Sequence, residues 1–186
     1  MRRYHTISYF TDFGDADKYK KQLKQKSCPH CGLIGFLISH GYLRGYRDGG
    51  SEMAVRACRF FCSNRGCRGG CGRTFPVYFP DALRRRQLSA PCFWKFILLV
   101  LRGMCRRAAW VELEPSFSLR HFYLLWEQVR RRQTVLREAL CRLCEPPDSR
   151  REDPTLHFFE HLSCAFPKAK CPVSAYQIHF QQSFLG

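Results

Sequence analysis

The chain has 186 residues, 45% of them hydrophobic and 25% charged, which is typical of one globular domain or two small ones and not of a disordered tail. Its 31 lysines and arginines outnumber 15 acidic residues and give a formal net charge of +16, which indicates a polyanionic partner. The longest uncharged apolar run, residues 96–101, has six residues, whereas a membrane-spanning helix needs roughly 20. The sequence therefore favours nucleic acid over a membrane as the partner.

The chain contains 12 cysteines, and its first 26 residues include no apolar segment of the kind that directs secretion. We therefore expect a cytoplasmic protein, in a reducing compartment where structural disulfides are rare. Metal binding is then the better explanation for at least some of the cysteines.

Charge and composition divide the chain into a basic N-terminal segment, a glycine-rich segment, a helical segment and a helical C-terminal tail, at residues 1–26, 27–80, 81–145 and 146–186. Within the first segment, the lysine-rich residues 18–26 predict a short cationic linker. The first 145 residues hold 27 of the 31 basic residues and 11 of the 15 acidic ones. The surface that binds a polyanion should therefore lie before Pro146.

Residues 28–79 contain short aromatic runs between glycines, a pattern that predicts small β-hairpins. They begin with Cys28-Pro29-His30-Cys31-Gly32, a knuckle in which a tight turn holds two thiolates on one face. A second cysteine pair some tens of residues later would complete a tetrahedral zinc site. Four cysteines could supply that pair: Cys58, Cys62, Cys67 and Cys71.

Cys71 is followed by Gly72, which repeats the ending of the first knuckle, and Cys62 ends the strand that leads into the loop. We therefore predict one structural zinc ion bound by Cys28, Cys31, Cys62 and Cys71. Cys67 is the alternative third ligand, because its separation from Cys71 is closer to knuckle spacing. Cys58 is expected to be a buried strand residue, and His30 to point away from the metal. The competing interpretation is a set of buried free thiols.

The rest of the chain predicts helices, at residues 91–102, 105–113, 118–143, 154–166 and 172–182. Phe122 and Trp126 fall on the apolar side of the long third helix, so we expect them in the core. On its outer face, Glu127–Arg131 and Glu138–Arg142 are spaced to form ion pairs.

Several motifs together resemble the zinc ribbon of bacterial insertion-sequence transposases and their solitary relatives. They are the first knuckle, the run His40-Gly41-Tyr42-Leu43-Arg44, Arg56, and the Cys71-Gly72-Arg73-Thr74-Phe75 ending. Residues 103–110 and 117–120 are similar to the helix-turn-helix that often follows this ribbon, so the resemblance covers roughly residues 27–145. The chain departs from it in the eight residues between Cys62 and Cys71, where relatives often have two.

The resemblance implies a small α+β fold, in which an N-terminal β-hairpin zinc ribbon precedes an all-α helix-turn-helix bundle. It also implies that the partner is double-stranded DNA, read by the first turn of the helix that Ser118 caps. A plain helical bundle with solvated arginines is the alternative. The expected DNA contacts are Arg44, Arg73, Arg106, Arg107, Ser118, Arg120, His121 and Arg131. Bound to DNA, the protein would be associated with the nucleoid.

The motif Cys141-Arg142-Leu143-Cys144 is a second C-x-x-C, and it could form a further metal site with residues of the tail, namely His157, His161, Cys164 and Cys171. Its spacing matches no knuckle, so we expect ordinary thiols here instead. The C-terminal helices could instead bind a partner protein or a second copy of the chain.

The sequence contains no recognisable catalytic constellation. The acidic residues after Pro80 mostly lie beside arginines on predicted helices, whereas a DNA-cutting transposase needs carboxylates that converge on metal ions. We therefore expect a DNA-binding protein that is not catalytic by itself. An active transposase or nuclease with an unrecognised site is one alternative, and an RNA-binding zinc ribbon is another.

Overall fold

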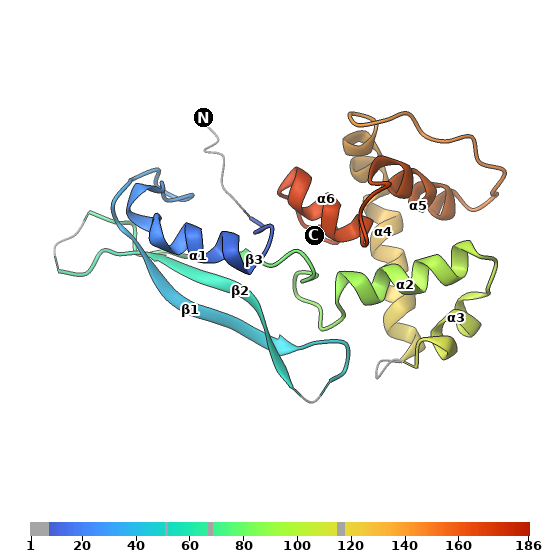
Figure 1. Cartoon of the computed structure of the whole chain (residues 1–186), viewed down its shortest axis with the longest axis horizontal. Helices are drawn as coiled ribbons and strands as arrows, with labels where there is room; N and C mark the ends of the chain where they lie inside the picture. Colours follow the sequence, from blue (N-terminus) through green and yellow to red (C-terminus); the bar gives the residue numbers. More distant parts are fainter. Residues whose placement is uncertain (1–7, 51, 67–68, 115–117) are drawn as a thin grey trace.

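We describe a computed structural model of the chain, comprising residues 8–50, 52–66, 69–114 and 118–186. Within these residues the fold is α+β, as expected. A three-stranded antiparallel sheet with one helix against it occupies one end of the molecule, and a cluster of helices occupies the other (Figure 1).

The sheet contains strands β1 (Leu37–Tyr46), β2 (Met53–Cys62) and β3 (Thr74–Tyr78), in the order β1-β2-β3. The chain just before residue 10 lies along the free edge of β3, where Tyr9 forms a parallel bridge with Tyr78. Strands β1 and β2 form the antiparallel β-hairpin that the sequence predicted. In the three-stranded sheet, β2 is the central strand.

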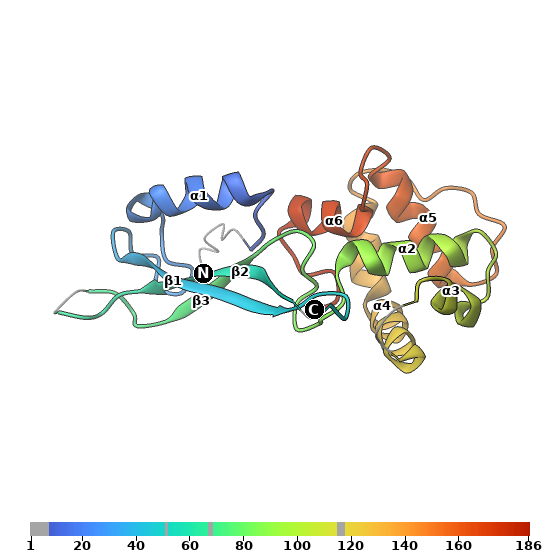
Figure 2. The same cartoon turned by 60° about the horizontal axis from the view of Figure 1, so that its bottom comes forward.

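The prediction of a linker at residues 18–26 is wrong. Its first part belongs to helix α1 (Phe13–Lys21), and a 3-10 turn, η1 (Leu23–Gln25), follows. Asp12 caps α1 by accepting a hydrogen bond from the Asp15 amide at 2.6 Å. Tyr19 is the largest buried residue of α1, and its ring packs 5.1 Å from that of Phe60. Figure 2 shows that α1 covers one face of the sheet only.

The helical part agrees with the sequence prediction within a few residues at each end. Its elements are α2 (Ala90–Leu101), α3 (Arg106–Glu112), α4 (Leu119–Leu140), α5 (Pro154–Ala165) and α6 (Pro172–Phe180). Phe122 and Trp126 of α4 are 1% and 4% exposed and pack against Phe96 of α2, so their assignment to the core is confirmed.

Of the two ion pairs predicted on α4, one is present. Glu138 and Arg142 pair at 2.9 Å. Glu127 instead pairs with Arg130, one turn away, at 3.2 Å. Arg131 is exposed and forms no ion pair with Glu127. Its guanidinium is therefore accessible to a nucleic acid.

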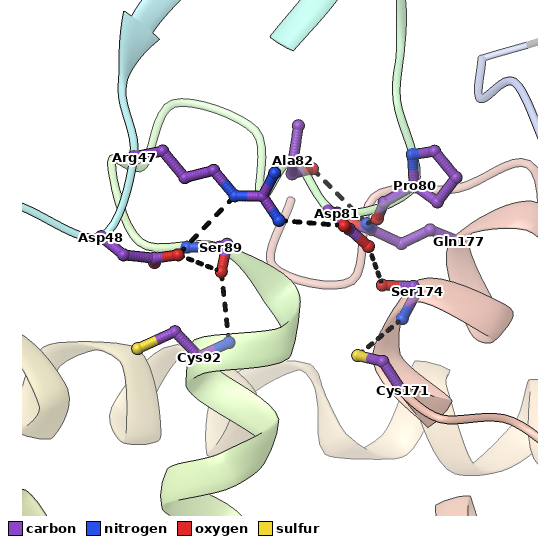
Figure 3. Close-up of polar contacts among 10 residues, drawn as sticks. All are labelled: Arg47, Asp48, Pro80, Asp81, Ala82, Ser89, Cys92, Cys171, Ser174 and Gln177. Carbon is purple, nitrogen blue, oxygen red and sulfur yellow. Dashed lines mark hydrogen bonds and ion pairs between the residues drawn. The ribbon is translucent and has the colours of Figure 1, made fainter. Parts of the chain in front are cut away.

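A polar network joins the sheet to the helical part (Figure 3). Asp48, in the turn between β1 and β2, accepts two hydrogen bonds of 2.6 Å from Ser89, one from its amide and one from its hydroxyl. The same hydroxyl accepts a bond from the Cys92 amide and so caps α2. Beside it, Asp81 accepts bonds of 3.0 Å from Arg47 and from the Ser174 hydroxyl on α6.

Ser89→Ala should destabilise the protein, because it removes both the α2 cap and one bond to the Asp48 carboxylate. We expect the free energy of unfolding to fall by about 1–2 kcal/mol in urea denaturation followed by circular dichroism. Ser118→Ala is the matched control, since Ser118 occupies the N-cap position of α4 but its side chain makes no capping bond. Equal losses in the two variants would contradict the role assigned to Ser89.

Candidate metal centre

Four cysteine side chains meet at the end of the sheet, with their sulfur atoms all within 4.8 Å of one another. They are those of Cys28, Cys31, Cys62 and Cys71. Cys28 and Cys31 lie in the loop before β1, Cys62 is the last residue of β2, and Cys71 lies in the loop before β3. Among the described residues this is the one group of three or more metal-binding side chains. It could hold one metal ion.

The two halves of the cluster have similar local geometry. The Gly32 amide donates to the carbonyl of Cys28 at 2.8 Å, and the Gly72 amide donates to the carbonyl of Cys62 at 2.9 Å. Both glycines have positive φ, 76° and 70°, which the turn requires. A backbone amide also approaches one sulfur in each half, from His30 to Cys28 at 3.4 Å and from Cys71 to Cys62 at 3.3 Å.

The eight residues between Cys62 and Cys71 form a loop whose two ends lie against each other. The Ser63 amide donates to the carbonyl of Phe36 at 2.8 Å. At Gly70, a Cβ atom would lie 2.2 Å from the carbonyl oxygen of Ser63, so only glycine fits. This closure brings Cys71 beside Cys62 despite the long insert. The alternative ligand, Cys67, lies outside the described residues.

The separations within the cluster suit a tetrahedral thiolate site. With metal–sulfur bonds of about 2.3 Å, as for zinc, a tetrahedron has sulfur–sulfur edges of about 3.8 Å. The Cys28–Cys71 and Cys31–Cys62 sulfur pairs are 3.7 and 3.8 Å apart. The residues present therefore fit a four-coordinate ion.

Burial affects how readily two of these thiols lose their protons. Cys28 and Cys62 are fully buried. Burial raises the pKa of the Cys28 thiol and raises that of Cys62 to about 12. Thiolates are the form that binds metal, so a cation beside them must offset the cost of burying their charge.

Two neighbouring residues that could bind a metal, His30 and Cys58, are not part of the cluster. The ring of His30 packs edge-on against Phe75 at 6.1 Å. Cys58 is fully buried on β2, as the sequence predicted.

The possible second site at Cys141 and Cys144 is not formed within the described part of the chain. The described residues bring no group of three metal-binding side chains together here. Nε2 of His157 lies 2.9 Å from the carbonyl oxygen of Pro147. Nε2 of His161 likewise lies 3.0 Å from the carbonyl oxygen of Cys144.

The residues expected to contact DNA differ in their exposure. Six of them are exposed on the surface, namely Arg44, Arg73, Arg107, Ser118, Arg120 and Arg131. Arg120 and Arg131 are eleven residues apart on α4, close to three full turns, so they share one side of the helix.

Two of the predicted contacts are only partly exposed. Arg106 pairs with Asp153 at 3.5 Å, and its guanidinium lies over the ring of Trp126 at 4.6 Å. His121 is half-buried. Burial lowers the pKa of His121, and the positive charge of Arg86 lowers it further. The turn between α3 and α4 includes residues 115–117, which lie outside the described residues.

Comparison of the chain with protein-family models, curated proteins and solved structures finds no match. Within the described residues, none of the helices is long and apolar enough to cross a membrane.

Metal content should depend on Cys62 and not on Cys58, although both are fully buried cysteines of β2. We expect purified protein to contain about one metal ion per chain by elemental analysis. Cys62→Ser should lose the metal, whereas Cys58→Ser and Cys67→Ser should keep it. Loss of the metal from Cys67→Ser alone would mean that Cys67 replaces Cys62 as the third ligand. A content of about two metal ions per chain would indicate a second site at Cys141 and Cys144.

Proposed function

We propose that the protein is a zinc-stabilised DNA-binding protein with no catalytic activity of its own. The observation that carries the proposal is the four-cysteine cluster at the end of a sheet in a chain of net charge +16. Four thiolates in two glycine-ended knuckles form the usual ligand set of structural zinc sites. Such a site has no open coordination position, so the metal holds the fold together and does not activate water.

DNA is the polyanion that the surface supports best. Arg120 and Arg131 on the exposed side of α4 are separated by about 16 Å along the helix axis, somewhat more than the width of about 12 Å of a major groove. A helix lying in the groove could therefore place Arg120 near base edges and Arg131 near phosphate. Arg107 on α3 adds a third exposed cation. The resemblance of residues 27–145 to the DNA-recognition part of insertion-sequence transposases also supports DNA as the partner.

Duplex binding should be strongly salt-dependent, with different roles for two arginines of α4. Arg120→Ala should cost on the order of 1–3 kcal/mol on a selected site and reduce the preference among sites. Arg131→Ala should weaken binding to all duplexes about equally and lower the salt slope by about one unit or less. Salt titrations on selected and scrambled DNA distinguish these effects.

Arg150→Ala, which removes an exposed arginine of the neutral tail, is the matched control and should bind like the unaltered protein. All variants must keep their metal content. If Arg120→Ala behaves like Arg131→Ala, α4 is only an electrostatic surface. Tighter binding to structured RNA than to any duplex DNA would replace DNA with RNA in the proposal.

The protein should not cut DNA. Metal-dependent cleavage requires carboxylates that converge on the ions, and among the described residues the cysteine group is the one cluster of metal-binding side chains. Supercoiled plasmid incubated with the protein and Mg²⁺ or Mn²⁺ should remain supercoiled on an agarose gel. Reproducible nicking that disappears when a single acidic residue is changed would establish an enzyme instead.

A further inference from the structure

Within the described residues, one face of the sheet has no helix packed against it. In Figure 2, α1 lies on one side of the strands, and no labelled helix lies on the opposite side. Strand pairing identifies the open side, because Phe60 faces α1 and its neighbours in sequence must face away. Phe61 pairs with Ile38 on β1 and Thr74 on β3, and Arg59 pairs with Pro76. We call this surface the open face.

The open face is basic and aromatic. The ring of His40 lies 5.6 Å from that of Phe61, and the guanidinium of Arg65 lies over the same ring at 5.6 Å. His40 is exposed and Arg59 is half-buried. None of the three strands contains an acidic residue. Cations therefore lie beside the exposed ring of His40, with no carboxylate on these strands to neutralise them.

At its far end the open face continues into a cleft of about 380 Å³ between β3 and the helical part. Pro76 and Tyr78 form one wall, and Arg84 and Arg132 come from the helical side. The other lining residues include serines and glutamines but no acidic residue. Arg84 is exposed, and Arg132 is held in place by donating to the carbonyl of Ser183 at 2.9 Å.

The open face and the cleft form one continuous surface. Pro76 lines the cleft and is also the strand partner of Arg59. Along β3, Tyr78 lies four residues beyond the level of Phe61, a distance of about 13 Å. This length suits a few nucleotides of one extended strand. The cleft volume is that of a small-molecule site, which can admit a single nucleotide but not a duplex.

We propose that the open face and the cleft bind a single strand of DNA. Arg59, Arg84 and Arg132 would contact phosphates, and unpaired bases would stack on His40 and Tyr78. Stacking favours a single strand over a duplex, because base faces are inaccessible in paired DNA. The choice of DNA rests on the proposed function. Arg132 belongs to α4, but Arg59, Arg84, His40 and Tyr78 do not, and none of these residues is among the expected duplex contacts.

The test is fluorescence anisotropy of the full chain with bound metal, using labelled oligo(dT) and a labelled duplex at fixed salt. Arg84→Glu changes an exposed loop residue and should weaken oligo(dT) binding about tenfold or more while leaving duplex affinity within about twofold. Arg120→Ala should show the reverse pattern. His40→Ala, with its metal content checked, should weaken oligo(dT) binding and leave duplex affinity within about twofold, because it removes a ring on which an unpaired base would stack.

Three results would overturn the inference. They are no binding of oligo(dT), equal affinity of Arg84→Glu and the unaltered protein for oligo(dT), and tighter binding of oligo(rU) than of oligo(dT). If duplex binding fails but oligo(dT) binding depends on Arg84 and His40, the inference stands and the proposed role of α4 falls. If only Arg120 matters, for both ligands, the open face is not a binding surface.

Discussion

The rest of the structure depends on the convergence of four cysteines from three separate stretches of chain. They lie in the loop before β1, at the end of β2 and in the loop before β3, beside a small apolar core that includes Leu37, Phe60 and Phe75. Bringing them within 4.8 Å of one another gathers sulfur atoms, two of them fully buried, whose thiolate charges repel unless a cation lies between them. A metal ion bound there would link the three stretches and add to the stability of the small core of the sheet. With that end fixed, β2 pairs on both sides and presents one face to α1 and the other to solvent.

The position of the helical part follows from a second constraint at the opposite end of the strands. Asp48 lies in the turn between β1 and β2. Its carboxylate accepts hydrogen bonds from the amide and the hydroxyl of Ser89, where α2 begins. Asp81 links Arg47 to Ser174 on α6 in the same region (Figure 3). These contacts place the helical cluster beside the sheet and leave the cleft at Tyr78 between them.

The helices and the cysteine ligands were predictable because their signals are local. Apolar periodicity, prolines near the first turn and glycine at the end of each knuckle determine them over a few residues. Helix α1 was missed because it buries only Ala16 and Tyr19, too few residues for a periodic pattern, and its lysines face solvent. The open face was also missed. Its residues come from three strands and a loop, and only the strand register shows that Arg59, Phe61 and His40 share a side.

The contacts of individual arginines explain why net charge alone is a poor guide to a binding surface. Arg106 is held between Asp153 and Trp126, and Arg56 donates to the carbonyl of Leu83 at 2.8 Å. Burial lowers the pKa of Arg56, because the charged guanidinium loses contact with water. Arg151 pairs with Glu160 beside the end of α2. Each of these cations makes contacts within the fold, and a ligand would have to compete with those contacts. Arg120 and Arg131 on α4 and Arg84 at the cleft are exposed, so both proposed nucleic-acid surfaces contain arginines that a ligand can reach.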